Sequence, residues 1–381
     1  MSRKRNIFEE VGEGAERSAA RAGGVIDGAR KDARRAIRLW LSALGVLVAL
    51  IVVVGGMTRL TDSGLSITEW QPITGALPPM GVEAWEAEFE KYRQIPEYQL
   101  QNEGMTLAEF RTIYWWEWGH RQLGRITGLV WAVGFLFFLA TRRIPAGWKG
   151  RLLLLGVLGG AQGAIGWWMV SSGLSGDMLD VASYRLAVHL GLAFVILGII
   201  AWQVMLLGRS EIGLLQARRV RDARLLSAAT GLMHLAFLQV LLGALVAGID
   251  AGRTYNDWPG MAGRFFPPAA FDLEPVWRNF LENAGLVQFM HRIAGYLLLA
   301  FGIAFWLRAR RSANRATRGA FTAVLAMLVL QLLLGIMTVL YVAPPGLAIL
   351  HQVGAALLFL LILRARFLAS YPLDQSVRDA T

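Results

Sequence analysis

The chain contains no cysteine, and charged residues make up only 17% of it. Without thiols it cannot form disulfides, thiolate zinc sites, cysteine-ligated iron–sulfur clusters or haem attachments through a CxxCH motif. The scarcity of charge accompanies 55% hydrophobic residues, which lies outside the range of soluble domains. We therefore expect a membrane protein in which any metal is held by histidine, carboxylate or a bound cofactor.

Long apolar runs without charge recur along the chain. Those long enough to span a bilayer cover residues 39–58, 152–176, 186–208, 225–249 and 320–363. The last run is long enough for two spans, because Pro344, Pro345 and Gly346 interrupt it. Two shorter runs, 126–141 and 293–307, bring the total to eight. The predicted fold class is an all-α integral membrane protein with eight transmembrane helices.

The basic residues are distributed unevenly between the two sides that this pattern defines. One side carries 27 of the 38 Lys and Arg residues. Its segments are 1–38, 142–151, 209–224, 308–318 and the C-terminus. The positive-inside rule makes this side cytoplasmic, so both termini are expected in the cytoplasm and the chain in a bacterial inner membrane. The net charge of +11 then reflects topology, and no nucleic-acid partner is expected.

The first 38 residues are rich in arginine but also contain six acidic residues. A transit peptide is poor in acidic residues, and a secretory signal needs an apolar segment at this point. We interpret 1–38 as a retained cytoplasmic tail that is solvated by its mixed charges. A helix lying on the lipid surface is the alternative.

The two halves of the sequence resemble each other. The matches are Asp62-Ser63-Gly64 with Asp250-Ala251-Gly252, Glu69-Trp70 with Asp257-Trp258, Pro79 with Pro267, His120-Arg121 with His291-Arg292, Gln162 and Gly166 with Gln331 and Gly335, and His189 with His351. Because four spans separate the halves, both enter the membrane from the same side. This predicts two four-helix bundles, 39–208 and 225–367, related by a pseudo-twofold axis along the membrane normal. A cytoplasmic linker, 209–224, joins them, and a tail, 368–381, follows.

The two short runs occupy matching places in the halves, and polar residues shorten both at their outer ends. Those residues are Glu117, His120, Arg121 and Arg125 in one half, and Gln288, His291 and Arg292 in the other. Short spans at matching positions are a pointer to a binding site. Several polar side chains at one helix end favour a ligand over simple contacts between helices.

Four of the five histidines belong to the repeat. They form one pair in each half, His120 with His189 and His291 with His351. Two imidazoles on facing helices suit axial ligation of a haem iron, whereas zinc lacks a further carboxylate or thiolate near either pair. Hydrogen bonding between helices is the alternative for each pair. His234 has no counterpart in the first half, so we expect it only to pack or hydrogen-bond.

A haem also presents anionic propionates, which favour arginine at the water interface. Candidates are Arg59, Arg121, Arg125, Arg185 and Arg292, with snorkelling to the interface as the alternative for each. The halves differ at one polar position, since Glu117 aligns with Gln288. Glu117 shares a helix face with His120, which makes it a candidate proton-transfer group. We expect a reactive site in the N-terminal half and a redox site in the C-terminal half.

Four segments together resemble the haem A synthases of cytochrome oxidase assembly. They are Glu117-Trp118-Gly119-His120-Arg121-Gln122-Leu123-Gly124-Arg125, Thr58-Arg59-Leu60-Thr61-Asp62-Ser63-Gly64-Leu65-Ser66, Tyr255-Asn256-Asp257-Trp258-Pro259-Gly260-Met261 and Gln288-Phe289-Met290-His291-Arg292. The resemblance covers about residues 39–367. The absence of cysteine matches the branch found in proteobacteria and mitochondria, and not the members with a cysteine pair in the first outer loop.

The resemblance implies an enzyme that oxidises the C8 methyl group of haem O to a formyl group by successive hydroxylations. It implies haem b as cofactor, with iron ligands His291 and His351. It places the substrate haem iron between His120 and His189, with Glu117 as the catalytic acid beside it. Implied partners are haem O synthase, reduced ferredoxin or a similar donor, cytochrome oxidase assembly factors and membrane lipid, and a homo-oligomer is also considered. Two other functions would use the same histidine pairs: a diheme b-type electron carrier like the anchor of a quinone-linked dehydrogenase, and a haem transporter or chaperone.

Overall fold

The structure is a computed structural model that describes residues 25–176 and 178–375. Within these ranges the chain is helical and forms no strand, and eight helices are long and apolar enough to cross a membrane. These are α2 (Val25–Leu60), α5 (Leu107–Ala140), α6 (Lys149–Val170), α7 (Ser183–Leu207), α9 (Ala223–Gly248), α11 (Ala284–Ala309), α12 (Arg315–Leu340) and α13 (Pro345–Ser370). The predicted fold class of an eight-span, all-α membrane protein is confirmed.

Several helix starts follow from local capping. At α5, the side chain of Thr106 accepts a hydrogen bond from the Glu109 N–H, and the Glu109 side chain accepts one from the Thr106 N–H, which is a capping box. Asn283 and Asn314 cap α11 and α12 in the same position. The last helix, α13, begins with Pro345, where its missing N–H costs no helical hydrogen bond.

The prediction that the second and sixth spans are short was wrong. α5 has 34 residues and α11 has 26, so His120 and His291 lie inside helices and do not open them. Hydropathy placed the starts too late because polar side chains such as Glu117 and Arg121 lower the apparent apolarity of the first turns. In the structure, backbone atoms of the outer loop form hydrogen bonds with those side chains.

The structure describes only part of the proposed tails. Residues 1–24 and 376–381 of the proposed tails lie outside the described ranges. From Val25 onward the chain is already helical and continues into α2, and α13 extends to Ser370. The linker 209–224 holds a further helix, α8 (Glu211–Arg219).

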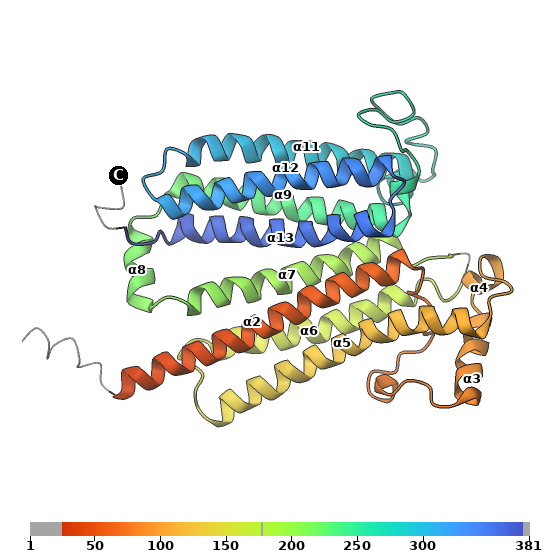
Figure 1. Cartoon of the computed structure of the whole chain (residues 1–381), viewed down its shortest axis with the longest axis horizontal. Coiled ribbons are helices and arrows are strands. Elements are labelled where there is room, and N and C mark those ends of the chain that lie inside the picture. Colours follow the sequence, from red (N-terminus) through yellow and green to blue (C-terminus); the bar gives the residue numbers. More distant parts are fainter. Residues whose placement is uncertain (1–24, 177, 376–381) are drawn as a thin grey trace, which may run out of the picture.

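The long helices lie side by side along most of their lengths (Figure 1). α7 packs on α2 and α6 in its own half and also on α9, while α13 packs on α12, α9 and α2. One hydrophobic cluster accordingly contains Val52 and Phe194 together with Leu232 and Phe359. The two halves therefore share a continuous apolar boundary.

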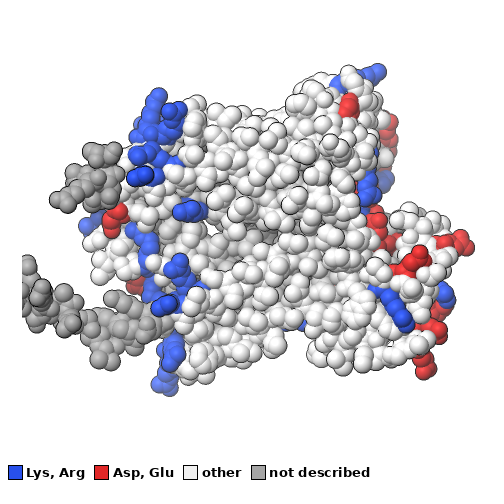
Figure 2. All heavy atoms as spheres, in the orientation of Figure 1, with Lys and Arg blue, Asp and Glu red and all other residues white. Residues whose placement is uncertain are grey.

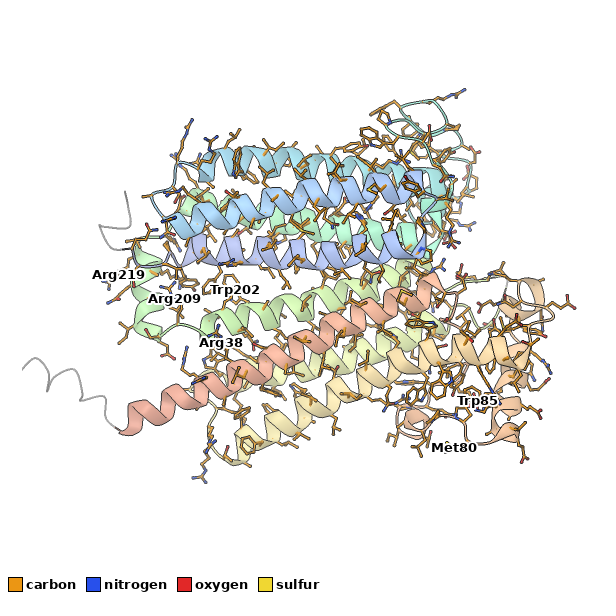
Figure 3. The ribbon with its side chains drawn as sticks, viewed as in Figure 1. Arg38, Met80, Trp85, Trp202, Arg209 and Arg219 are labelled. Atoms are coloured by element: carbon orange, nitrogen blue, oxygen red, sulfur yellow. The ribbon has the colours of Figure 1, made fainter. Side chains whose placement is uncertain are left out.

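The two ends of the bundle differ in structure and charge. α8 lies at one end, and the outer-loop helices α3 (Val82–Arg93) and α4 (Pro96–Leu100) lie at the other (Figure 1). Lys and Arg gather over the α8 end, whereas Asp and Glu are prominent at the opposite end (Figure 2). Figure 3 labels Arg38, Arg209 and Arg219 at the basic end and Trp85 in the outer-loop region. This charge separation agrees with the side assignment made from the sequence.

Candidate functional site

Two histidine pairs are formed by helices that are distant in sequence. The ring centres of His120 on α5 and His189 on α7 lie 6.4 Å apart. Those of His291 on α11 and His351 on α13 lie 6.3 Å apart. Each half of the chain therefore brings together the two histidines that its repeat motif contains.

Both separations fit one metal ion held between two imidazoles. With a metal–nitrogen bond of about 2.0–2.1 Å and roughly 1.1 Å from each nitrogen to its ring centre, coaxial rings lie about 6.3 Å apart. No group of three or more His, Asp, Glu or Cys among the described residues has the spacing of a metal site. A metal at either pair would thus have two protein ligands, which suits a macrocycle that supplies the others.

Each of the four imidazoles lies against a glycine of a neighbouring helix. A Cβ added at Gly55 or Gly166 would meet His120 or His189 at 2.9 Å. In the second half, a Cβ at Gly243 would meet His291 at 3.1 Å, and one at Gly335 would meet His351 at 3.2 Å. These contacts are tighter than side chains ordinarily tolerate. The four glycines therefore let neighbouring backbones approach and fix the position of each ring.

One histidine of each pair is also held by a glutamine. Gln162 Nε2 lies 3.2 Å from Nδ1 of His189 and donates to the carbonyl of the same residue at 3.0 Å. Gln239 makes the same two contacts with His291, at 3.1 and 3.0 Å. Polar groups of this kind orient imidazole ligands. The sequence repeat linked Gln162 to Gln331 but did not reveal Gln239.

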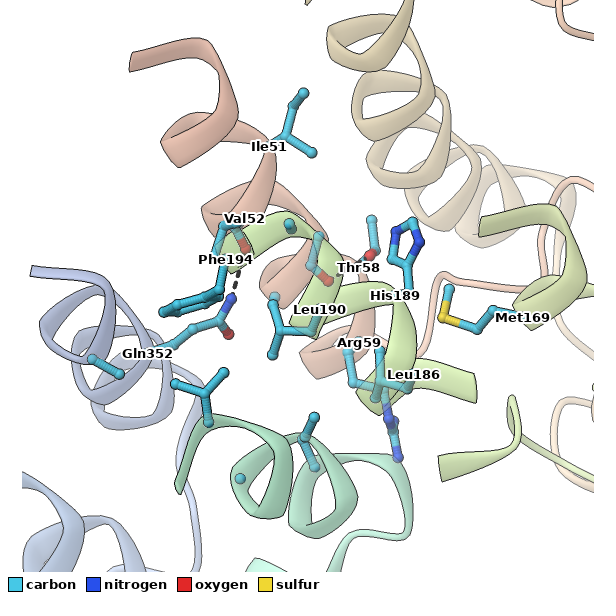
Figure 4. Close-up of a pocket in the computed structure, with 18 of the residues that line it drawn as sticks. Ile51, Val52, Thr58, Arg59, Met169, Leu186, His189, Leu190, Phe194 and Gln352 are labelled. Atoms are coloured by element: carbon cyan, nitrogen blue, oxygen red, sulfur yellow. Dashed lines mark hydrogen bonds between the residues drawn. The ribbon is translucent and has the colours of Figure 1, made fainter. Parts of the chain in front are cut away.

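A cavity of about 930 Å³ borders all four histidines and Glu117. Among the lining residues, Gln352 on α13 reaches α2 and donates to the Val52 carbonyl at 2.6 Å. Figure 4 shows this bond beside Phe194, with His189 and Arg59 further along the same cavity. Residues of both halves thus line one continuous space.

Glu117 is buried, and four donors engage its two carboxylate oxygens. Oε2 accepts from the Ser66 hydroxyl at 2.8 Å and from the Ile67 N–H at 2.7 Å. Oε1 accepts from Nε and from a terminal nitrogen of Arg121, at 3.0 and 2.6 Å. Hydrogen bonds to charged groups are stronger than neutral ones. Glu117 therefore anchors the first outer loop on α5 as well as lining the cavity.

Gln288, the counterpart of Glu117, makes the reverse kind of contact. Its Nε2 donates to the Tyr255 carbonyl at 3.0 Å, and its buried Oε1 has no hydrogen-bond partner among the described residues. The first half thus uses an acceptor to hold its outer loop, whereas the second uses a donor. The polar difference seen in sequence is a real difference in how the two loops are attached.

The five arginines considered for propionates all hold parts of the outer surface. Arg121 and Arg125 donate to carbonyls of Ile67, Glu69, Gln71 and Pro72. Arg292 donates to carbonyls of Tyr255, Asp257 and Gly260. Arg59 donates to Asp62, Asp180 and Asp250. Four of the five line the cavity, whereas Arg185 does not and contacts Trp168 and Ser171 instead.

His234 stands apart from the pairs. It lies on the exposed surface of α9, where Nδ1 lies 2.9 Å from the Thr230 carbonyl. It does not line the cavity. The structure therefore brings together the four repeated histidines and leaves the fifth on the outside.

The model of the cytochrome oxidase assembly protein family matches residues 38–363 of the chain. The chain belongs to this family. It is 64% identical to the heme A synthase of Ruegeria pomeroyi over 380 residues, which cover 99% of this chain and 100% of that protein. It is 64% identical to the heme A synthase of Dinoroseobacter shibae over 381 residues and 100% of both chains. The heme A synthase of Paracoccus denitrificans is 62% identical over 375 residues, 98% of each chain.

Within this cytochrome oxidase assembly family member, four features of the site were not recognised from sequence. They are Gly55 and Gly243 against His120 and His291, Gln239, the carboxylate set around Arg59 and the buried acid Glu97 in the first outer loop. The repeat carried a signal for the glycines, since Gly55 and Gly243 lie 188 residues apart like the loops that follow them. Glu97 has no such signal, because the first outer loop is much longer than its counterpart.

Proposed function

We propose that the chain is a haem A synthase, a membrane enzyme that oxidises the C8 methyl group of haem O to a formyl group by successive hydroxylations. Relatives with this name match it over essentially their whole length. The observation that carries the proposal is the presence of two equivalent histidine pairs with a carboxylate beside only one of them. Each half has a histidine pair, but only the first half has an acid, Glu117, where the second has Gln288. This arrangement suits one haem that reacts and one haem that stays bound as a cofactor.

In this proposal His291 and His351 hold haem b, and His120 and His189 hold the substrate haem. The separations within both pairs support bis-histidine ligation. When bound, the haem iron supplies one-electron redox chemistry. The protein supplies axial ligands, an apolar cavity and a fixed outer loop. Glu117 holds that loop over the cavity and orients Arg121 through two hydrogen bonds.

Extraction of the haems from the purified protein tests the proposal. Cells that make haem O and the wild-type chain are expected to yield haem A, together with haem b that stays with the protein. A diheme electron carrier would give haem b alone, and a haem carrier would give exchangeable haem without haem A. Either result would contradict the proposed activity.

We also propose that the chain resides in the bacterial inner membrane with both termini in the cytoplasm, and that the two bundles are related by a pseudo-twofold axis along the membrane normal. The basic α8 end supports this orientation. A reporter fused after Thr381 is expected to be active in the cytoplasm, and one inserted at the exposed Gly104 is expected outside. A periplasmic C-terminus would contradict the orientation.

The partners proposed with this function follow from its chemistry. Haem O synthase supplies the substrate, reduced ferredoxin or a similar donor supplies electrons, and cytochrome oxidase assembly factors receive the product. A donor that approaches from the cytoplasm would meet the basic end of the bundle. Co-purification from native membranes under mild detergent tests these contacts.

A further inference from the structure

Glu97 is a buried carboxylic acid that the proposed function does not use. It lies in the short helix α4 of the first outer loop and is only 3% exposed. Its Oε2 atom is buried and has no hydrogen-bond partner in the described part of the chain. Leaving such a group without a partner costs free energy. A residue kept in this state calls for an explanation.

The carboxyl group of Glu97 borders the same cavity as Glu117 and the substrate-side histidines. Three other carboxylates are near enough for their charges to act on it, those of Asp62, Glu117 and Asp180, and one cation, Arg59, acts in the opposite direction. Arg59 is already shared by three aspartates at 2.8 to 3.3 Å. In the described part of the chain, Arg253 also lies 3.6 Å from Asp250, and Arg121 is paired with Glu117.

Among the described residues Glu97 forms no ion pair. Its nearest cation, Arg59, is engaged by Asp62, Asp180 and Asp250, although the cavity lining as a whole carries as many arginines as acids. No described group of His, Asp or Glu has the spacing of a metal site, so a proton is the simplest compensating charge. Burial, reinforced by the neighbouring carboxylates, raises the pKa of Glu97 to about 8. Burial, and after it the charge of Glu97, raises the pKa of the neighbouring Tyr92, whose hydroxyl accepts a hydrogen bond from Asn102.

Two of these acids are buried and two are partly exposed. The side chain of Glu117 is 4% exposed, and Glu97 is 3% exposed. The side chains of Asp62 and Asp180 are 40% and 41% exposed. Glu97 is therefore a buried acid that borders the cavity and lies near enough for its charge to interact with two carboxylates that reach solvent.

Glu117 by itself is poorly arranged to accept a proton, because four donors occupy its oxygens. Glu97 has no such bonds. We propose that Glu97 is a proton-relay residue for methyl oxidation, carrying protons from the outer aqueous face, by way of Asp62 and Asp180, to the Glu117 side of the cavity, where donor-driven hydroxylation consumes them. This inference rests on the proposed function. In each transfer an O–H bond breaks on the donor and one forms on the acceptor, through intervening water where needed, and no electron moves.

Glu97→Gln tests the relay because glutamine keeps the size of the side chain and removes its titratable proton. Haem A formation at neutral pH is expected to slow on the order of tenfold or more. The rate of the wild type should change with pH near 8, where Glu97 ionises, and this change should be absent from Glu97→Gln. Glu97→Asp retains a carboxyl group and should restore most of the rate. Glu103→Gln, an exposed acid in the same loop, is the matched control and should behave as wild type.

A second measurement does not depend on turnover. Infrared spectroscopy of the purified protein should show a protonated carboxylic-acid C=O band that titrates near pH 8 and is missing from Glu97→Gln. Haem b content should be equal in all variants. A slow Glu97→Gln variant that has lost the band but keeps its haem b would show that Glu97 transfers protons and does not merely pack.

Several outcomes would overturn the relay. One is a Glu97→Gln protein with the wild-type rate and pH profile. Another is equal loss of rate and of haem b in the Gln and Asp variants, which would indicate packing. A third is a wild-type rate that falls to that of Glu97→Gln when divalent cations are chelated, which would indicate a cation site. A wild-type protein that makes no haem A would contradict the proposed function, while the infrared band would still report whether Glu97 binds a proton.

Discussion

The guanidinium of Arg59 donates to the carboxylate of Asp250 at 2.8 Å, although 191 residues separate them. The contact ties the last turn of α2 to the outer end of α9. Asp62, the counterpart of Asp250 in the repeat, also accepts from Arg59, and both aspartates have left-handed backbone conformations, with φ of 46° and 49°. One cation thus joins equivalent corners of the two halves.

Replacing Arg59 with glutamine is expected to destabilise the fold. Three carboxylates would lose their shared cation, and since they are each partly exposed, we expect a loss of about 1–3 kcal/mol in the free energy of unfolding. Thermal unfolding in detergent measures the change. Arg253→Gln is the control, because Arg253 is 43% exposed and lies 3.6 Å from its partner. Equal stability of the two variants would show that the Arg59 contacts contribute little.

Replacing His351 with alanine is expected to deplete the tightly held haem. One of two axial ligands would be lost, and the remaining site would be weaker and high-spin. The reduced absorption spectrum and the haem-to-protein ratio of the purified protein report this. His234→Ala should leave both unchanged, because His234 lies outside the cavity. Loss of haem from the His234 variant alone would refute the assignment of the pairs.

Gly166→Ala is expected to disturb the substrate-side pair. The new methyl group would meet Cε1 of His189 at 2.9 Å, so the imidazole would have to move. Haem A yield should fall several-fold. Gly163→Ala, on the same helix, is a matched control because its methyl group would meet nothing within 4 Å, and alanine favours a helix by about 0.5–1 kcal/mol. If the two variants have the same yield, the close contact does not position His189.

Glu117→Gln is expected to lose haem A while haem b remains. The substitution also places an amide NH₂ toward donors such as the Ile67 N–H, so it loosens the loop as well as removing the acid. Ser66→Ala separates the two effects, because it removes one loop hydrogen bond and keeps the carboxylate. Haem composition of both proteins is the measurement. A normal haem A yield from Glu117→Gln would exclude an essential role for this carboxylate.

The stability of the protein is expected to fall as pH rises from about 5 to 8, because of Glu97. Its pKa is raised to about 8 in the folded chain but is about 4.3 when exposed. Between these values the folded state binds more protons than the unfolded state, so increasing pH favours unfolding. The melting temperature of Glu97→Gln should therefore depend less on pH than that of the wild type. Parallel curves would show that Glu97 ionises normally.

Much of the architecture could be predicted from the chain. The eight apolar segments and the unequal number of Lys and Arg residues on the two sides depend on composition, which a bilayer constrains strongly. The pairing of His120 with His189 depends on an internal repeat, which carries long-range information without an alignment of relatives. The true starts of α5 and α11 could not be obtained from hydropathy, because their polar residues are satisfied by loops that are distant in sequence.

The parts of the site that were missed have a common physical reason. Gln239 and Glu97 matter through contacts with other elements. Gln239 contacts His291 as Gln162 contacts His189, but it lies on α9 whereas Gln162 lies on α6, so the two do not align in the repeat. The bonds that the candidate arginines make to loop carbonyls depend on how those loops fold. Such contacts follow from tertiary packing and leave no periodic pattern in the sequence.

The boundary between the halves has a consequence for how the chain could be divided. Phe194 and Phe359 meet across it with ring centres 5.5 Å apart, and Gln352 donates to the backbone of α2. If the chain were cut in the linker 209–224, both fragments would display this apolar surface to lipid, and the C-terminal fragment would also display the unpaired side-chain amide of Gln352. The fragments should therefore reassemble when produced together, and the loop between them serves to keep two complementary surfaces at high local concentration.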